Sequence, residues 1–584
     1  MIRRMLLALS CATFFTPAAA SAKCEVAQLA ELKVTMVGAK PMVDAQINGH
    51  PVRFVADSGA FFSSISPGSA REFGLSLSSL PPGLQIRGIG GSADAALTRV
   101  KDFTLAGIPL HNIPFIVGGS EVGPGAGLLG QNVLGLGDVE YDLEHGMIRL
   151  MRAKGCKDLS LAYWAADRPV SIIETEPRDQ LQTHTIGTVY LNGARLRAVF
   201  DTGASTSVLS LAAAARAGIR PDSPGVVAAG SSRGLGRHTV PTWIAPFDSF
   251  KVGGEEIHRT RLRIGDIGLP NADMLIGADF FLSHRLYVAN GERKLFFTYD
   301  GGPIFNITPN HAVDGQGEAL ALPTDVKEPT DAAGFSGRGT AFAARRQFVE
   351  AEADLDHAIA LAPTESRYFY ERAMVRLARR EQVRAAEDLD QALKLAPDDP
   401  RAHMVRARLR LAAHDRPGAL ADIAAAEHGM APASDLRLEL GELYESVDAF
   451  DQAIPQYDAW LRAHPDDSRK PTALNARCWV RALAGRDLQD ALSDCDAAIR
   501  AARGNASYLD SRGLVRLRLG HFDKAIADYD AALAIRSNSA WSLYGRGVAK
   551  RRLGQAAAAD LDIAAALAIA PHLGERFRKL GIAD

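Results

Sequence analysis

Hydrophobic residues change their spacing along this chain at about residue 305. Before that point, short apolar runs are separated by turn-forming Asn, Asp and Gly residues, a pattern typical of β-strands. Two of these runs, residues 52–56 and 196–200, each follow an Asn-Gly hairpin signal. After about residue 335, Ala, Leu and Arg dominate and apolar residues recur at helical spacing. The pattern therefore predicts an all-β region followed by an all-α region.

The β region contains a duplication. Asp57 lies nine positions after Asn48 and Asp201 nine positions after Asn192, and each Asp opens an Asp-Ser/Thr-Gly-Ala turn. Further landmarks recur in the same order at offsets of 144 to 147 residues, which indicates an internal repeat of a whole structural unit. These landmarks are two Gly-rich segments (Gly88, Ile89, Gly90, Gly91 and Gly234, Leu235, Gly236) and two apolar-apolar-Gly segments (Leu128, Leu129, Gly130 and Leu275, Ile276, Gly277).

On these motifs, residues 30–300 resemble a single-chain, two-lobed aspartic peptidase of the retropepsin-like and pepsin-like superfamily. The resemblance implies an all-β bilobal fold, with one lobe in residues 23–160 and the other in 161–305. It further implies that Asp57 and Asp201 are catalytic. By the same resemblance, Ser58, Gly59, Thr202 and Gly203 support the dyad, the two Gly-rich segments are flaps that close over a peptide or protein substrate, and the apolar-apolar-Gly segments are strands that brace the catalytic turns.

The chemistry of such a site requires only the two carboxylates and a water molecule. Two carboxylates held close together share one proton, so that one can activate water while the other polarises the scissile carbonyl. We therefore expect no cofactor and no metal. One departure from the family pattern is Phe61-Phe62 after the first turn, where the second turn has small polar residues. It leaves open an alternative, a catalytically inactive protease fold that binds peptides as a scaffold.

The amino terminus predicts export. Arg3 and Arg4 precede an apolar run, and Ala20-Ser21-Ala22 forms a small-residue cleavage site, so residues 1–22 are interpreted as a cleavable signal peptide. No later stretch is apolar enough to span a membrane. An Ala- and Arg-rich composition suggests a bacterial protein, which is then periplasmic or secreted. A lipid anchor on Cys11 is the alternative.

Cysteine usage agrees with an exported protein. Four cysteines remain after removal of the signal peptide, and their positions favour pairing Cys24 with Cys156 and Cys478 with Cys495. Free, buried thiols remain an equal alternative for each pair. Metal ligation is not expected, because no His residues accompany the cysteines at zinc spacing.

The carboxy-terminal part has a period near 34 residues, as in Arg512-Gly513 and Arg546-Gly547. It resembles tetratricopeptide (TPR) repeats, about seven of them in residues 336–571, after a linker in 306–335 and before a capping helix in 572–584. Such a solenoid implies a protein partner bound through its concave face. Arginines such as Arg406, Arg408 and Arg410 are expected on solvated helix faces.

Overall charge and motifs exclude several other classes. The formal net charge of −2 does not indicate the basic surface that binding of nucleic acid requires. The sequence has no metalloprotease, serine-hydrolase or P-loop signature. The function that the sequence predicts best is an exported aspartic endopeptidase joined to a TPR array that recruits a substrate or partner.

Overall fold

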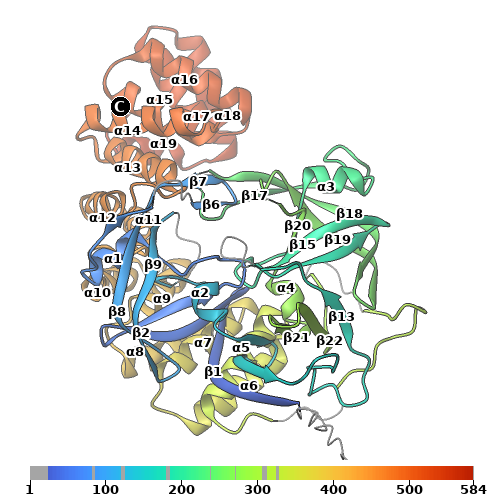
Figure 1. The fold of residues 1–584 in the computed structure, drawn as a ribbon. Helices are drawn as coiled ribbons and strands as arrows, with labels where there is room; N and C mark the ends of the chain where they lie inside the picture. Colours follow the sequence, from blue (N-terminus) through green and yellow to red (C-terminus); the bar gives the residue numbers. More distant parts are fainter. Residues whose placement is uncertain are drawn as a thin grey trace, which may run out of the picture.

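The computed structural model describes residues 24–81, 86–119, 125–178, 184–236, 238–269, 271–305, 312–323 and 328–582. Two β-rich lobes come first and a long array of helices follows (Figure 1). The predicted fold class, an all-β bilobal region joined to an all-α solenoid, is confirmed.

Lobe 1 is a barrel built on a tight hairpin. Asn48 and Gly49 both have positive φ, 50° and 82°, which lets β2 turn directly into β3. The barrel closes because β2 pairs with β8 as well as with β3. Its strands are β2 (Lys40–Ile47), β3 (His50–Ala56), β4 (Ser64–Ile65), β8 (Ala95–Leu105), β9 (Ile108–Gly118) and β10 (Gly127–Leu129), with β5 (Ser78–Ser79) at the edge and helices α1 (Pro67–Glu72) and α2 (Gln131–Leu134).

Lobe 2 repeats this plan. Its hairpin turn has Asn192 and Gly193 at φ 46° and 80°, and the barrel closes where β14 pairs with β18. Its elements are β14 (Ile186–Leu191), β15 (Ala194–Phe200), β16 (Val208–Ser210), β17 (Val227–Ser232), β18 (Val240–Val252), β19 (Glu255–Gly265), β20 (Met274–Ile276), α3 (Leu211–Arg216) and α4 (Ala278–Phe281).

A shared sheet joins the two lobes. β11 of the first half pairs with β21 of the second, with Glu140 opposite Tyr287, and β1 continues from this sheet into barrel 1. The segments that close the two halves therefore form one platform. Its strands are β1 (Glu25–Val37), β11 (Asp138–Asp142), β12 (Met147–Lys154), β13 (Ser171–Glu174), β21 (His284–Ala289) and β22 (Lys294–Tyr299).

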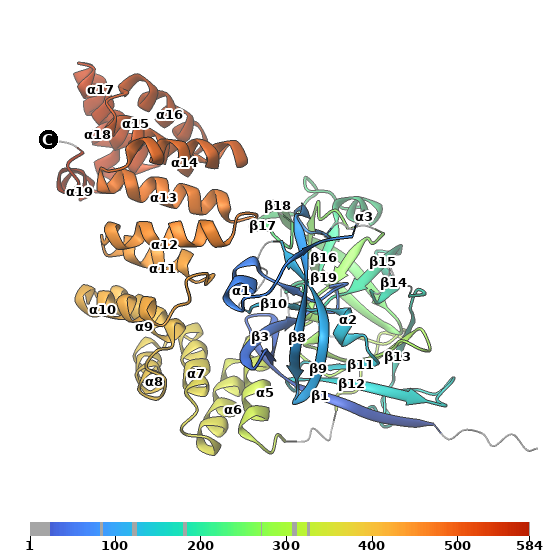
Figure 2. The same cartoon turned by 60° about the vertical axis from the view of Figure 1, so that its left-hand side comes forward.

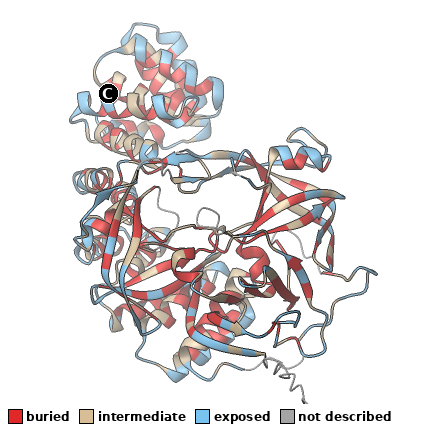
Figure 3. Ribbon diagram, in the orientation of Figure 1, coloured by how far each residue is buried: buried red, intermediate tan, exposed pale blue. Residues whose placement is uncertain are grey.

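The interior of both lobes is apolar and continuous. Aromatic side chains fill it, with Phe54, Phe103 and Phe115 clustered in lobe 1 and Phe200, Phe280 and Phe281 in lobe 2. Figure 3 shows buried residues interspersed with exposed ones along the barrel strands and along the helices of the array. A disulfide joins Cys24 to Cys156 across the ends of β1 and β12.

The array consists of seven antiparallel helix pairs and a short final helix, α19 (Leu573–Lys579). A second disulfide, Cys478–Cys495, links the two helices of one pair. The paired helices are α5 (Ala332–Ala344) and α6 (Phe348–Leu361), α7 (Ser366–Ala378) and α8 (Gln382–Leu395), α9 (Pro400–Ala412) and α10 (Arg416–His428), α11 (Arg437–Ser446) and α12 (Phe450–Ala463), α13 (Lys470–Ala484) and α14 (Leu488–Ala501), α15 (Ala506–Arg518) and α16 (Phe522–Ile535), and α17 (Ala540–Arg552) and α18 (Ala556–Ile569).

A ladder of arginines and aspartates connects successive repeats. Arg512 of α15 bonds to Asp496 of α14 at 2.8 Å and to the buried Asp528 of α16 at 2.6 Å. Arg406 likewise bridges two aspartates, and Arg410 also pairs with buried Asp422. The expectation that these two arginines lie on solvated faces is therefore wrong, because each neutralises a carboxylate between helices. The other bridging arginines are Arg372, Arg477 and Arg546.

The first repeats pack against lobe 1, and the last ones extend past it (Figure 2). Helix α5 lies against β1, where the backbone N–H of Met36 donates to Thr340 Oγ1 at 3.0 Å. Farther along, Arg71 of α1 donates to the carbonyls of Arg462 and Ala463 at the end of α12. The array is thus held to the β-rich region at both ends of its first half.

Part of the segment predicted as a linker packs on lobe 2. The backbones of Val313 and Glu256 exchange two hydrogen bonds of 2.9 and 3.0 Å, and Ala312 is buried. Helix α5 then begins at Ala332, four residues before the predicted start of the repeats. The linker therefore includes ordered backbone contacts.

The predicted signal peptide, residues 1–22, lies outside the described residues. Within the described ranges, no single helix is long and apolar enough to cross a bilayer. The helices α18 and α19 meet that length and composition only when taken together, and they are bent by 110° relative to each other.

The arginine ladder generates a stability prediction. Arg512→Met leaves buried Asp528 with Arg516 alone, so the free energy of unfolding of the array should fall by about 1–3 kcal/mol. Arg551→Met removes an exposed ion pair with Asp560 and should change stability by less than about 1 kcal/mol. Urea unfolding followed by far-ultraviolet circular dichroism compares the two variants. Equal losses would contradict a structural role for the ladder.

Candidate active site

Each aspartate of the duplicated motif lies where a barrel strand ends. β10 runs parallel to β3, and Leu129 accepts a hydrogen bond from the Asp57 backbone N–H at 3.0 Å. In lobe 2, β20 runs parallel to β15, and Ile276 accepts from the Asp201 N–H at 2.8 Å. The apolar-apolar-Gly segments therefore lie beside the strands that carry the aspartates and fix where each turn begins.

The two turns are bonded to each other across the lobe boundary. The N–H of Ser58 donates to Thr202 Oγ1 at 3.0 Å, and the N–H of Thr202 donates to Ser58 Oγ at 2.9 Å. Each hydroxyl then donates to a strand carbonyl of the opposite lobe, Ser58 to Phe200 and Thr202 to Ala56. All these groups are buried, so this crosswise lock holds one turn against the other without competition from water.

The lock places the two carboxylates side by side. Gly59 faces Asp201 so closely that a Cβ atom on the glycine would lie 2.3 Å from the Asp201 Cγ. Gly203 faces Asp57 in the same way, at 2.1 Å. A side chain at either glycine would push the opposite carboxylate away, so both positions require glycine. Each glycine N–H also donates to the aspartate of its own turn, at 2.9 and 2.8 Å.

This pairing changes the acidity of the site. Burial, the negative charge of Asp201 and a hydrogen bond with that side chain raise the pKa of Asp57 well above its usual range. Lys40 and the Gly59 N–H oppose the shift. Two carboxylates in contact titrate as a pair, so the dyad keeps one proton at a pH where an isolated carboxyl has lost it.

A second tier of hydrogen bonds supports each turn, made by residues outside the predicted motifs. In lobe 1, Ser63 donates from both N–H and Oγ to Asn132 Oδ1 and accepts from the Gly130 N–H. In lobe 2, Ser207 and Asp279 make the equivalent bonds with Gly277. The offsets of 144 and 147 residues could have revealed both pairs.

Both Gly-rich segments lie over the dyad, and they touch each other. The first is the hairpin of β6 (Ile86–Gly88) and β7 (Gly91–Ala93), and the second follows β17 (Figure 1). The N–H groups of Gly236 and His238 donate to the carbonyls of Ile89 and Gly90, both at 3.1 Å. The two flap tips therefore form a closed roof.

The roof and the dyad enclose a cleft of about 460 Å³ lined by both lobes. Ile89 packs on the apolar floor of lobe 2 and Leu235 on that of lobe 1, so each tip covers the opposite lobe. Phe61 and Phe62 pack on each other, with ring centroids 4.9 Å apart, and neither is among the described residues that line the cleft. The aromatic pair therefore does not fill this cleft.

Two basic residues in the cleft were also missed. Lys40 of lobe 1 donates to the Gly203 carbonyl of lobe 2, and His184 of lobe 2 makes a hydrogen bond with the Gly59 backbone of lobe 1. Burial lowers the pKa of both, although Asp57 and Asp201 oppose this at Lys40 and Asp201 opposes it at His184. Their offset is again 144 residues, but their different chemistry hides the repeat in the sequence.

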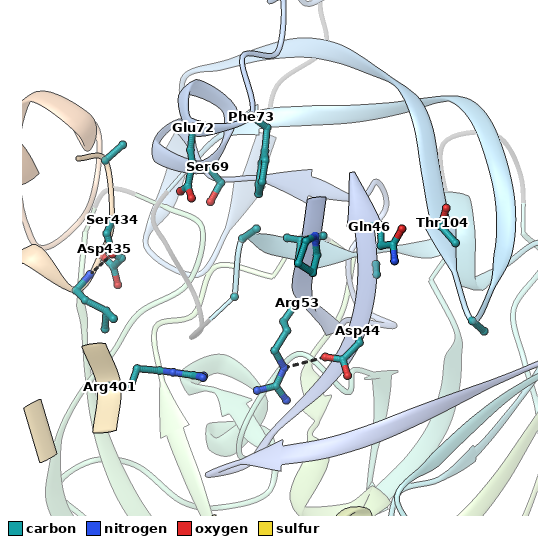
Figure 4. Close-up of a pocket in the computed structure, with 18 of the residues that line it drawn as sticks. Asp44, Gln46, Arg53, Ser69, Glu72, Phe73, Thr104, Arg401, Ser434 and Asp435 are labelled. Carbon is teal, nitrogen blue, oxygen red and sulfur yellow. Dashed lines mark hydrogen bonds and ion pairs between the residues drawn. The ribbon is translucent and has the colours of Figure 1, made fainter. Parts of the chain in front are cut away.

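A larger pocket lies between lobe 1 and the array. It has a volume of about 860 Å³, and its lining includes Arg53, Asp44, Arg401 and Asp435 (Figure 4). Arg53 pairs with Asp44 at 3.2 Å, while Arg401 reaches the same space from α9. In the described part of the chain, no group of three or more His, Cys, Asp or Glu side chains is placed to hold a metal ion.

Two barrels that each contribute one aspartate to a shared, flap-covered cleft define an aspartyl-protease architecture. Family comparisons agree with this geometry. Residues 43–135 match a family described as gag-polyprotein putative aspartyl protease, and residues 187–280 match a family described as aspartyl protease. The N-terminal half thus contains two aspartyl protease family domains, and a helical repeat array follows them. Comparison with curated proteins finds no match.

Among solved structures, the array is similar to TPR proteins. YrrB, a TPR protein described as having an unusual peptide-binding site, is 19% identical, covers 33% of this chain and 97% of its own, and has a TM-score of 0.29. A TPR protein from Parabacteroides merdae is 15% identical over 43% of this chain and 98% of its own, with a TM-score of 0.33. The pilus biogenesis factor PilW is 18% identical, with coverages of 37% and 97% and a TM-score of 0.31.

The second tier predicts a pH-dependent weakness in lobe 2. Burial raises the pKa of Asp279 to about 6 in the folded state. The folded state therefore loses stability as the pH rises from roughly 4 to 6, and this loss persists at higher pH. Asp279→Asn cannot ionise and copies the Asn132 arrangement of lobe 1. The variant should exceed the wild type in stability by about 3 kcal/mol at neutral pH.

Urea unfolding at about pH 4 and about pH 7.5 measures this difference, which should vanish at the lower pH. Asp248→Asn, at an exposed position on β18, is the matched control and should change little at either pH. An equal effect of Asp279→Asn at both pH values would rule out ionisation as the cause.

Proposed function

We propose that this protein is an exported aspartic endopeptidase that hydrolyses peptide bonds with the Asp57–Asp201 dyad. The observation that carries the proposal is the contact of the two carboxylates, which the crosswise lock holds inside a roofed cleft. A binding protein has no need for two buried acids pressed together, because their mutual repulsion and desolvation cost stability.

The arrangement supplies general acid–base chemistry. The raised pKa of Asp57 favours the protonated form, which can donate a hydrogen bond to the scissile carbonyl oxygen. Its ionised partner then accepts a proton from a water molecule that attacks the carbonyl carbon. The tetrahedral intermediate collapses when a proton reaches the leaving amine, and no covalent enzyme intermediate forms.

We further propose that the protein acts in the periplasm or outside the cell. Residues 1–22 have the charged, apolar and small-residue segments of a signal peptide. The pairs Cys24–Cys156 and Cys478–Cys495 are joined as disulfides, which persist in oxidising compartments. Cell fractionation tests this: the chain found with an intact amino terminus in the cytoplasm would contradict export.

The array is proposed to recruit protein substrates or partners. Its first half is fixed to lobe 1, so a protein bound along the helices lies beside the cleft-bearing lobes. The interdomain pocket opens onto both components, because its lining includes Arg53 of β3 and Arg401 of α9. This arrangement would raise the local concentration of a bound chain near the dyad.

The catalytic proposal predicts that Asp57→Asn and Asp201→Asn each abolish cleavage, because neither carboxylate can perform both proton transfers alone. The assay is digestion of a denatured protein mixture by the purified full chain over the range from about pH 3 to about pH 8. Asp248→Asn should cleave like the wild type. Persistent activity in either dyad variant would sink the two-carboxylate mechanism, and an inactive wild type would favour a peptide-binding scaffold.

The recruitment proposal predicts that a change in the interdomain pocket affects cleavage of a protein substrate but not of a short peptide. Arg401→Glu reverses a charge in the interdomain pocket, so cleavage of a protein substrate should fall several-fold while cleavage of a short peptide stays unchanged. Steady-state rates on both substrates measure this difference. An equal change for both, or none for the protein, would remove the pocket from recruitment.

A further inference from the structure

The cleft carries more positive than negative charge. Of its described lining residues, Lys40, Arg87 and Arg233 are cationic, and the acidic ones are Asp57 and Asp201. The dyad bears a single negative charge when it shares one proton, so the three cations outnumber it. A peptide that enters this space therefore meets a net positive surface.

These cations occupy related positions in the two halves. Arg87 and Arg233 each precede the first glycine of a flap tip and lie 146 residues apart. The hydrogen bonds between the tips hold both arginines at the roof. Lys40 and His184 lie 144 residues apart and each reaches the catalytic turn of the other lobe. Basic side chains thus lie both at the flap tips and beside the catalytic turns.

Lys40 could exchange its present hydrogen-bond acceptor for an acidic side chain of a bound peptide. Its ammonium group is bonded to the Gly203 carbonyl, beside the dyad, and Arg233 is near enough to act on it electrostatically. An acidic side chain placed here gains a charge-assisted hydrogen bond to a cation that is already partly desolvated. A basic side chain would face Lys40 and Arg233 at close range.

The floor and the flap tips are apolar between these charges. Leu128 lines one side under Leu235, and Ile186, Val199 and Leu275 line the other under Ile89. These surfaces favour apolar residues at the bond to be cleaved.

We propose that the cleft selects acidic peptide segments, in which apolar residues at the cleavage point are flanked by glutamate or aspartate side chains that bind Lys40, Arg87 and Arg233. The inference that acidic peptides are cleaved rests on the proposed peptidase function. The inference that they bind preferentially does not. It assigns to Lys40, which lies outside the duplicated motif, the role of a specificity-determining residue.

Binding is tested first with full-length Asp201→Asn, which should bind peptide without cutting it. Short fluorescein-labelled peptides share an apolar centre and carry Glu, Gln or Lys on both sides, and fluorescence anisotropy measures their affinities. The Glu peptide should bind on the order of tenfold more tightly than the Gln peptide, and the Lys peptide most weakly. The Glu preference should shrink at high salt.

Variants in the same background locate the selection. Lys40→Met and Arg233→Met should each remove most of the Glu preference, and Lys40→Arg should keep it. Arg195→Met, at an exposed position on β15, is the matched control and should leave it unchanged. Equal binding of the Glu and Gln peptides, or a preference that survives both methionine variants, would overturn the proposal.

Cleavage of the same peptides by the wild type distinguishes a failure of the peptidase function from a failure of the selection for acidic peptides. Acidic binding without cleavage would reject the peptidase and support the charge selection. Cleavage of both peptides together with equal affinities for the Glu and Gln peptides would support the peptidase and reject the charge selection.

Discussion

The crosswise hydrogen bonds between Ser58 and Thr202 are the constraint on which the rest of the site depends. They join two barrels that are separate folding units along the chain, and they do so directly under the carboxylates. The contact between Asp57 and Asp201, the raised pKa of Asp57 and the closed roof all require this lobe spacing. The shared sheet through β11 and β21 reinforces the spacing from below.

The duplication made much of this site predictable. Some positions accept only one residue type, as Gly59 and Gly203 do because each faces the aspartate of the opposite lobe. These positions have the same residue in both halves, so the sequence repeat reveals them. The residues that support the turns could not be recognised in this way, because Asn132 and Asp279 accept equivalent hydrogen bonds but are different residue types. Lys40 and His184 differ even more, and only their equal offset relates them.

Features that arise from packing between distant segments could not be predicted. The docking of α5 on β1 joins residues about 300 positions apart and leaves no periodic signal. The inner role of Arg406 and Arg410 was misjudged for a related reason, because arginine on a helix usually indicates a solvated face. Here their partner Asp422 is buried on the other helix of the same pair, and the two arginines reach over it.

The bonded flap tips have a kinetic consequence. The hydrogen bonds from Gly236 and His238 to Ile89 and Gly90 join the two tips above the cleft. If the cleft takes a peptide as proposed, that chain must pass beneath the joined tips or part them, at a net cost of about 1–3 kcal/mol for two backbone hydrogen bonds. If only a minor open state admits a chain, the apparent affinity falls in proportion to the population of that state. Capture through the open state is slowed by the same fraction. Under the proposed peptidase function, loose chain ends and unfolded segments would therefore pass between the tips more readily than compact domains.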